Sequence, residues 1–347
     1  DKEVFKKSLL SWAQQFDEVV WLDSNGHSDS NSSFDALLAV DGLTALTTDY
    51  QNGFDDLATY QSETKDWIFG YLSYDMKNDV EFLTSSNIDG LGFPELYFFQ
   101  PKKIIRIKGD QIEFMYLNMV LDELTADFDT ITQQTFNLDE TILPKEDIRI
   151  RMRIFKDEYF RKVGKMLAHI QQGDIYEANF CQEFYANDCT IDPLGTFRNL
   201  NSISKAPFSA YVKLFDKYLC SASPERYLKK AGNKVISQPI KGTAARSSSL
   251  IADTELKLHL GQDEKERSEN IMIVDLVRND LSKSAVKGSV TVEELCEVYS
   301  FEQVHQMIST ISAMVPADKN PVTLIKETFP MGSMTGAPKV SAIKIIE

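Results

Sequence analysis

Cysteine is scarce in this sequence, with four among 347 residues. They are Cys181, Cys189, Cys220 and Cys296, and no two of them form the C-x-x-C spacing of a zinc or redox site. No histidine stands beside them at the spacing of zinc ligands. The cysteines therefore predict reduced, partly buried thiols of a cytoplasmic protein.

Long apolar runs and an excess of positive charge are also missing. No run approaches the about 18 apolar residues of a membrane span, and residues 1–20 are amphipathic, unlike a signal peptide. The 37 basic residues are outnumbered by 52 acidic ones, which gives a net charge of −15. Such a surface repels phosphate backbones, so we expect neither a membrane nor nucleic acid as a partner. An anionic substrate would need local donors or a divalent cation.

Apolar residues are plentiful enough for a large core, at 43% of the chain. At about 150 residues per domain, the length predicts two domains or one large one. Residues 1–150 form a first half of short apolar runs between turn clusters, and residues 143–150 suit a linker into a second half, 151–347. We expect the two halves to form one intertwined structural unit.

The elements do not follow a βαβ rhythm. Strands are predicted at WIFGYLSYD, ELYFFQ, KKIIRIK, FSAYVKLF, YLCSASPERYLKK and KVISQPIKG. An apolar helical face from Tyr159 to Ile170 ends at Gly173, after which the period of two in DIYEANFCQEF predicts a strand with one apolar and one polar face. Residues 263–283 have a helical pattern, whereas VHQMISTISAMV suits a helix or a strand. Mostly antiparallel strands mixed with helices predict the α+β class.

Two carboxylates lie on the apolar stripe of the helix predicted at 263–283. Glu269, Ile273, Leu276 and Asp280 share one face at this spacing. A buried carboxylate requires a cation or hydrogen bonds. The pair therefore indicates either a helix turned so that both residues meet solvent, Lys or Arg, or a Mg²⁺ ligand.

Lys241 ends an apolar strand just before a loop that contains Gly242 and Thr243. A lysine at such a place is either a desolvated nucleophile or base, or a lysine whose stem lies along the strand while its head meets water. Glu225 lies upstream across a predicted hairpin at Ala231–Gly232–Asn233, so both side chains can reach one sheet edge. They form either a pair for proton transfer or a surface salt bridge.

Two further signals are weak on their own. GSMTGAPK is a glycine-containing loop that runs into a helix, and such an N-terminus can bind a carboxylate or phosphate, although the segment is not a Walker A motif. The lone His305 is typical of a structural histidine.

In order along the chain, however, these segments form a specific pattern. GDIYEANFCQEF, SASPERYLKK, QPIKGTAAR, DEKERSENIMIVDLVRNDL, VHQMISTISAM and FPMGSMTGAPK resemble the chorismate-utilising enzymes, from about residue 155 to the end. The resemblance implies two large, mainly antiparallel β-sheets packed face to face with helices outside. It also implies that chorismate, a dicarboxylate, binds in a cleft through Mg²⁺, which reverses the local field of an acidic protein.

Two positions indicate the branch of the family. The loop reads PIKGT, with Lys241, as in the branch that converts chorismate to 4-amino-4-deoxychorismate for folate synthesis, whereas the anthranilate-forming branch has PIAGT. Glu177 stands where the water-using branch has a lysine, so that branch is disfavoured. The resemblance implies that Lys241 forms a covalent adduct at C2 and that Glu225 is the acid–base residue.

The resemblance assigns the remaining site residues less directly. It implies that Glu269 binds Mg²⁺ and that His305 lies beside the reacting ring. It also implies that the substrate is contacted by Gly242, Thr243, Gly336, Ala337 and Lys339.

Parts of the family pattern are missing from the sequence. The second Mg²⁺-binding glutamate of the family follows GAPK, and because no counterpart is present we expect the chain to be truncated at its C-terminus. No cysteine lies in a G-x-C-x-G context, so a separate glutamine amidotransferase subunit would supply ammonia. The alternatives are an anthranilate-forming enzyme and a non-catalytic chorismate-binding or scaffold subunit.

Overall fold

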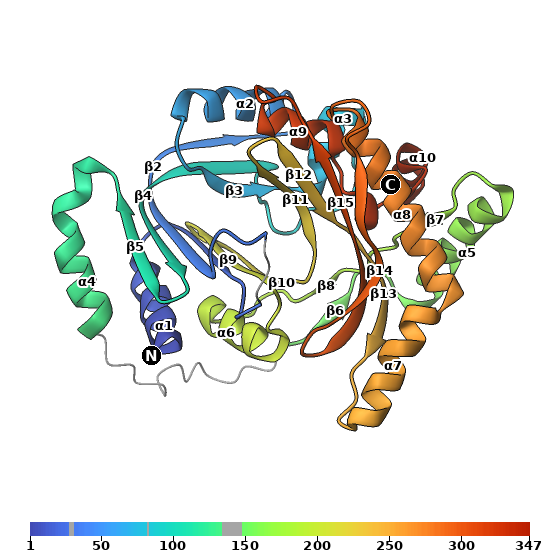
Figure 1. The fold of residues 1–347 in the computed structure, drawn as a ribbon, viewed down its shortest axis with the longest axis horizontal. Coiled ribbons are helices and arrows are strands. Elements are labelled where there is room, and N and C mark those ends of the chain that lie inside the picture. The colour runs from blue at the N-terminus through green and yellow to red at the C-terminus, as the bar shows by residue number, and fades with distance from the viewer. Residues whose placement is uncertain (28–30, 82, 134–147) are drawn as a thin grey trace.

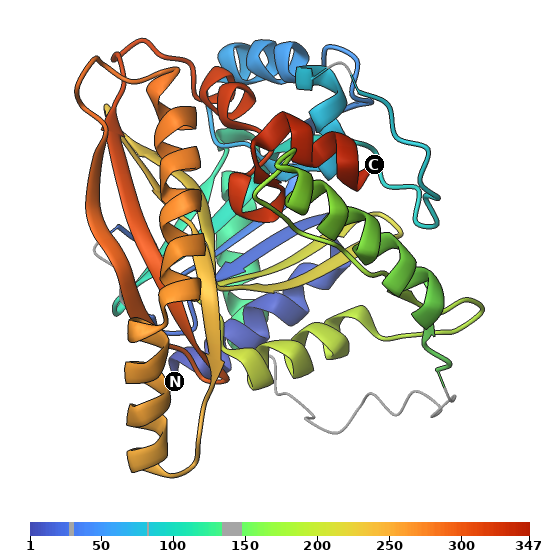
Figure 2. The same ribbon diagram turned by 90° about the vertical axis from the view of Figure 1, so that its right-hand side faces the viewer.

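The computed structural model describes residues 1–27, 31–81, 83–133 and 148–347. Two antiparallel sheets form its centre, and helices cover their outer faces (Figures 1 and 2). In Figure 1, α1 (Lys2–Trp12) and α4 (Leu124–Gln133) lie on the left, while α7 (Leu250–Gln262) and α8 (Glu264–Ser282) lie on the right, with both sheets between them. The α+β class predicted from the sequence is confirmed.

The larger sheet has seven strands in the order β10-β9-β1-β2-β4-β3, with β5 paired to β4. The strands are β1 (Glu18–Asp23), β2 (Ala36–Thr48), β3 (Phe69–Leu72), β4 (Leu96–Lys108), β5 (Gln111–Tyr116), β9 (Phe208–Leu214) and β10 (Lys217–Ser223). The predicted strands ELYFFQ and KKIIRIK are one continuous strand, β4. β1 pairs with β2 on one side and with β9 on the other, so both halves of the chain share this sheet. Most of the linker predicted at 143–150 lies outside the described residues.

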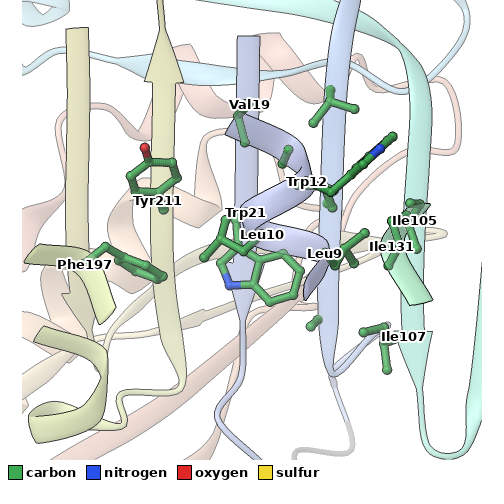
Figure 3. Close-up of a cluster of buried hydrophobic side chains, with 14 residues drawn as sticks. Leu9, Leu10, Trp12, Val19, Trp21, Ile105, Ile107, Ile131, Phe197 and Tyr211 are labelled. Atoms are coloured by element: carbon green, nitrogen blue, oxygen red, sulfur yellow. The ribbon is translucent and has the colours of Figure 1, made fainter. Parts of the chain in front are cut away.

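Apolar side chains alternate between the two faces of this sheet, as a strand period of two requires. On one face, Trp21 and Tyr211 pack under Leu9 of α1, Ile131 of α4 and Phe197 of α6 (Pro193–Ser204) (Figure 3). Burying each large side chain of this kind contributes about 1.5–3 kcal/mol. The opposite face carries a second cluster around Val20, Phe99 and Val212.

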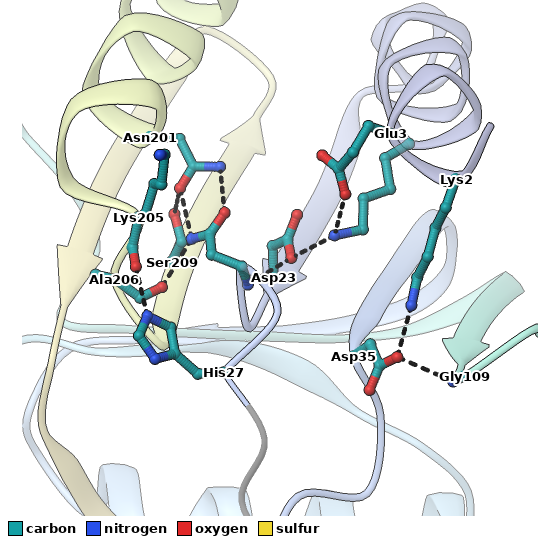
Figure 4. A network of polar contacts seen from close by, with 12 residues as sticks. Lys2, Glu3, Asp23, His27, Asp35, Gly109, Asn201, Lys205, Ala206 and Ser209 are labelled. Carbon is teal, nitrogen blue, oxygen red and sulfur yellow. Dashed lines mark hydrogen bonds and ion pairs between the residues drawn. The ribbon is translucent and has the colours of Figure 1, made fainter. Parts of the chain in front are cut away.

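Polar contacts also join the two halves of the chain. Asn25, after β1, exchanges side-chain hydrogen bonds with Asn201 of α6, at 2.8 and 2.9 Å (Figure 4). Ser209 of β9 donates to the same Asn201 oxygen, and His27 bonds the carbonyl oxygen of Lys205 at 2.8 Å. Together with the shared sheet, these contacts hold the second half of the chain against the first.

The smaller sheet has five strands arranged around β15 (Val304–Met314). The others are β11 (Arg226–Ala231), β12 (Lys234–Gln238), β13 (Ile240–Ala245) and β14 (Thr291–Ser300). β12 and β13 pair with successive parts of one edge of β15, and β14 pairs along the other edge. VHQMISTISAMV is therefore a strand, and the predicted hairpin turn is present, with Gly232 at φ +56°.

The helix predicted at 263–283 is α8, and Asp263 caps its first turn by accepting from the backbone N–H of Glu266. Its buried residues Ile273, Val274 and Val277 pack on Val235 and Ile311 of the smaller sheet. The helix around Tyr159–Ile170 is α5 (Lys156–Gln172), and it ends at Gly173 with φ +84°, as predicted. The remaining helices are α2 (Gly53–Thr64), α3 (Lys77–Glu81), α9 (Pro321–Thr328) and α10 (Lys339–Ile346).

The long strand predicted from DIYEANFCQEF is wrong. Only β7 (Glu177–Ala178) and β8 (Phe184–Tyr185) are extended and paired there, with β16 (Gly336–Ala337) and β6 (Arg151–Met152) respectively. The apolar face expected of this strand is not buried, since Tyr176 and Phe184 are 65% and 64% exposed. Alternation supplies the faces of a strand, but a strand also needs a partner backbone, and β16 offers one over two residues only.

Across the residues that the structure describes, no helix is both long and apolar enough to cross a membrane.

Candidate active site

Lys241 lies on β13 at an irregularity in its pairing with β15. The register shifts between Ile240 and Thr243, and the intervening Gly242 adopts φ +95°. A Cβ on Gly242 would lie 3.2 Å from Cβ of Met307 and 3.3 Å from the Glu266 side chain. Any residue larger than glycine would therefore be crowded at this position. A bulge of this kind re-aims the neighbouring side chain.

The Lys241 ammonium is held by two residues of a distant segment. Its Nζ donates to Oδ1 of Asn179 at 3.1 Å and lies 3.5 Å from Oε1 of Glu177. The side chains of Lys241 and Glu177 are only 16% and 14% exposed. Burial raises the pKa of Glu177, the charge of Lys241 opposes that rise, and the nearby Glu269 carboxylate adds to it.

Glu225 lies in the turn between β10 and β11, and its side chain contacts β13, the strand of Lys241. Its Oε1 accepts from Oγ of Ser333 at 2.5 Å and from the backbone N–H of Ile240 at 3.3 Å. Burial beside apolar side chains such as Leu228 and Val277 raises the pKa of Glu225, against the opposing effects of Ser333, Ile240 and the Lys241 charge. The structure thus places a buried carboxyl group of raised pKa against the backbone of Ile240, where the charge of Lys241 acts on it.

The segment 333–337 joins the two sides of this site. Ser333 donates to Glu225, and its carbonyl oxygen accepts from Nδ2 of Asn179 at 2.5 Å. The backbone N–H of Asn179 donates to the carbonyl oxygen of Thr335. Gly336 pairs with Ala178, and a Cβ on Gly336 would lie 2.3 Å from the carbonyl oxygen of Glu177. Gly336 therefore permits the close approach that positions Glu177 and Asn179.

Glu269 lies on α8 close enough to Glu177 to influence its pKa. Its side chain is 34% exposed and forms an ion pair with Lys265, itself 74% exposed, at 3.3 Å. The adjacent Asn270 donates to the carbonyl oxygens of Lys241 and Met307, which ties α8 to β13 and β15. Glu269 is thus a partly exposed carboxylate at the edge of the site, and it is paired with an exposed lysine.

Two of the predicted site residues are held in structural contacts. Asp280, the second carboxylate of the α8 stripe, is buried against Lys339, and Lys283 donates to it at 3.1 Å. Lys339 also donates to the carbonyl oxygen of Thr328 at 2.8 Å, and burial lowers its pKa. The structure therefore brings Lys339 to α8 and α9, and does not bring it to Lys241.

His305 of β15 contacts helix α7 and the end of β14. Its Nε2 is 3.1 Å from Oδ1 of Asp253 on α7, and its Nδ1 is 2.9 Å from Oγ of Ser300. Asp253 is held in turn by Arg246, whose guanidinium keeps the pKa of that carboxyl well below its usual range. The structure does not bring His305 together with Lys241 or Glu225, and its imidazole, 1% exposed, belongs to a structural network.

We expect His305→Ala to lower the free energy of unfolding by about 2–3 kcal/mol, because it leaves a cavity and removes two polar contacts. Chemical denaturation of the variant and the unmodified protein measures this difference. Activity assays at a temperature where the variant and the unmodified protein both remain folded separate a structural role of His305 from a catalytic one. A loss of turnover without a loss of stability would show that His305 has a catalytic role.

The residues that the sequence analysis missed are Asn179, Ser333 and Gln306. Asn179 stands on the polar face of the alternating segment, so its position was visible but its partner was not. Gln306 is the residue of β15 that pairs with Thr243. Within the described part of the chain, its Oε1 and that of Glu177 are buried atoms without a hydrogen-bond partner. A neighbouring residue, not His305, therefore offers an unsatisfied polar group beside Thr243.

The chain matches the family model of chorismate binding enzymes from residue 15 to residue 347, and it belongs to this family. Among curated proteins, it is 33% identical over 297 residues to the chloroplastic aminodeoxychorismate synthase of Arabidopsis thaliana, a match covering 80% of this chain and 32% of that protein. It is 38% identical over 208 residues to aminodeoxychorismate synthase component 1 of Escherichia coli, covering 59% and 46%. The chain thus spans less than half the length of these relatives.

Relatives of another activity are also similar. Anthranilate synthase component 1 of Thermus thermophilus is 30% identical over 292 residues, covering 81% of this chain and 62% of that one. The solved structure of anthranilate synthase component I from Streptococcus pneumoniae superposes with a TM-score of 0.75 at 22% identity, over 92% of this chain and 79% of that one. This likeness shows the fold, which is the one that the sequence resemblance implied.

Proposed function

We propose that the protein aminates chorismate at C4 to give 4-amino-4-deoxychorismate, as an aminodeoxychorismate synthase component I. The observation that carries the proposal is that Glu225, a buried carboxyl group of raised pKa, accepts from the backbone N–H of Ile240, and the charge of the next residue, Lys241, acts on it. The names of the curated relatives support the same substrate and reaction. A scaffold subunit would have no use for this pair.

The pair suits a reaction in two displacements. Lys241, as the free amine, attacks C2 of chorismate while the conjugated double bonds shift and the C4–O bond breaks. Glu225 gives its proton to the departing hydroxyl, which leaves as water. Ammonia then forms the C4–N bond, the double bonds shift back, and the C2–N bond breaks with its electron pair returning to Lys241. Splitting one difficult substitution into two steps is covalent catalysis.

Glu269 is the residue we propose for holding Mg²⁺ with the substrate. Mg²⁺ takes one or two protein carboxylates and completes its shell with water and substrate oxygens, so a partly exposed carboxylate at the site edge fits it. Among the described residues no group of three or more His, Cys, Asp or Glu gathers into a metal cage, which is consistent with a site shared with substrate. When bound, Mg²⁺ would neutralise the negative charge of the substrate carboxylate.

We expect removal of divalent cations with EDTA to abolish turnover and leave the melting temperature nearly unchanged. Added Mg²⁺ should restore turnover, and Glu269→Gln should raise the Mg²⁺ concentration needed for half-maximal rate by about tenfold or more. Lys265→Ala, which removes the partner of Glu269, is the matched control and should not raise that concentration. Full turnover in EDTA would contradict the assignment of Glu269.

The ammonia would come from a glutamine amidotransferase subunit. Curated relatives named component 1 imply a second component, and free ammonium replaces it in a test of chemistry. The deciding experiment incubates the full-length protein with chorismate, Mg²⁺ and an ammonium salt, and identifies the product by chromatography and mass spectrometry. 4-Amino-4-deoxychorismate, with its enolpyruvyl group retained, supports the proposal. Anthranilate would show that Lys241 does not decide the branch, and no product would favour a binding subunit.

A further inference from the structure

The contacts of Lys241 define a site for a nitrogen cation. Two side-chain oxygens, Oδ1 of Asn179 and Oε1 of Glu177, lie 3.1 and 3.5 Å from the ammonium nitrogen. The amide of Asn179 cannot turn to present its nitrogen instead, because that nitrogen donates to the carbonyl oxygen of Ser333. The backbone of both residues is held against the segment 335–337. These acceptors are therefore fixed in place before any ligand arrives.

Glu177 depends on Lys241 for its counter-charge. Its Oε1 is buried, and within the described residues the Lys241 ammonium, 3.5 Å away, is the cation that faces it. The other ionisable group that acts on it is Glu269, of like charge. A buried carboxylate oxygen that loses its cation is costly, so once Lys241 has moved away another cation with several N–H donors would bind there favourably.

We propose that Glu177 and Asn179 form the binding site for the ammonium ion that supplies the new C4 nitrogen. This inference rests on the proposed function. In the resting protein the Lys241 head group occupies the site. When the Lys241 nitrogen becomes bonded to C2, it leaves both acceptors, and ammonium, with the same charge and the same N–H donors, takes its place beside the adduct.

The proton and electron balance closes with these groups. Ammonium gives one proton to the Glu177 carboxylate and becomes ammonia, whose lone pair forms the C4–N bond. The C2–N electron pair returns to Lys241, which leaves as the free amine and takes from solvent the proton that its ammonium gave up before the attack. The product carries a protonated amino group, Glu177 passes its proton to solvent, and Glu225 regains from solvent the proton that it gave to the leaving hydroxyl.

The first experiment measures binding without turnover. In Lys241→Ala the site has lost its resident cation, so ammonium chloride should raise the melting temperature above that in sodium chloride at equal ionic strength. We expect a shift of about 1–2 °C at an ammonium concentration about tenfold above its dissociation constant. The unmodified protein, whose site is filled by Lys241, should show no such difference.

The same melting comparison includes two further variants. Lys241→Ala/Glu177→Gln should lose the shift, whereas Lys241→Ala/Glu183→Gln should keep it, because Glu183 lies in the same segment but pairs with Arg153. A shift of equal size in the unmodified protein, or one that persists without the Glu177 carboxylate, overturns the inference. This outcome does not depend on whether the protein forms aminodeoxychorismate.

The second experiment asks which form of the nitrogen substrate is bound. The free ammonia fraction of an ammonium solution rises about tenfold per pH unit below the ammonium pKa. If Glu177 binds ammonium, the KM in total ammonium should stay nearly constant over about one pH unit near neutrality in the unmodified protein. In Glu177→Gln it should be higher and should fall about tenfold per pH unit. A KM of the unmodified protein that follows free ammonia overturns the proposal.

Discussion

Replacing Lys241 with alanine should lower aminodeoxychorismate formation from chorismate and ammonium by about 10⁴-fold or more, the range for loss of a covalent nucleophile. The Lys241 amine is the group that we propose forms the bond to C2, and an alanine side chain offers no nucleophile in its place. The side chain is 16% exposed, and the bulge at Gly242 is a property of the backbone, so we expect the variant to fold. Product formation by mass spectrometry and the far-ultraviolet circular dichroism spectrum measure the two effects.

Lys265→Ala is the control for this result, since it removes an exposed lysine close to the site. Mass spectrometry of the unmodified protein quenched during turnover provides a second readout, because the adduct should appear on Lys241 and be absent from the variant. A Lys241→Ala protein that forms the product at the full rate with ammonium would rule out covalent catalysis through this residue.

Glu225→Gln should lower kcat by about 10²–10⁴-fold, because the amide cannot protonate the departing hydroxyl. The pH dependence carries the same information. A general acid acts in its protonated form, and burial raises the pKa of Glu225, so activity should persist above the ordinary carboxyl range and fall as the pH rises through the raised value. The remaining activity of Glu225→Gln should lack this alkaline decline.

Ser333→Ala tests the hydrogen bond that opposes the rise in the pKa of Glu225. The Ser333 hydroxyl donates to Oε1 of Glu225 and lowers the pKa of that carboxyl, so its removal should move the alkaline decline to higher pH while keeping the acid. Glu293→Gln, which removes an ion pair on β14 with Lys234, is the control and should leave the profile in place. An unchanged alkaline decline in Glu225→Gln would assign the acid to another group.

Local sequence patterns were sufficient to predict many of the helices and turns. The helix at 263–283 was predictable because Asp263 supplies a cap and the apolar residues recur at helical spacing. The hairpin at Gly232 was predictable because its backbone adopts a positive φ, which glycine tolerates. That hairpin also explains why Glu225 and Lys241 could be expected near each other from the sequence.

Other features depended on partners that are remote in the chain. VHQMISTISAMV became a strand because β12, β13 and β14 all supply backbone pairing to it, and this decided between two equal local patterns. The same register decided that His305 faces Asp253 of α7 and that Gln306 lies opposite Thr243. A shift of one residue along a strand reverses the face of a side chain, and the sequence contains no signal for that choice.

The sequence by itself determined the α+β class, the helices and hairpins with local caps and turns, and the residue types Lys241, Glu225 and Glu269 on which the chemistry depends. Spacing within one segment is enough for such conclusions, since the interactions involved span only a few residues. Only the tertiary structure decided that Glu177 and Asn179 surround the Lys241 ammonium, that Ser333 reaches Glu225, and that Lys339 is held by Asp280. These contacts join residues between 59 and 108 positions apart, and their geometry is set by sheet register and helix packing.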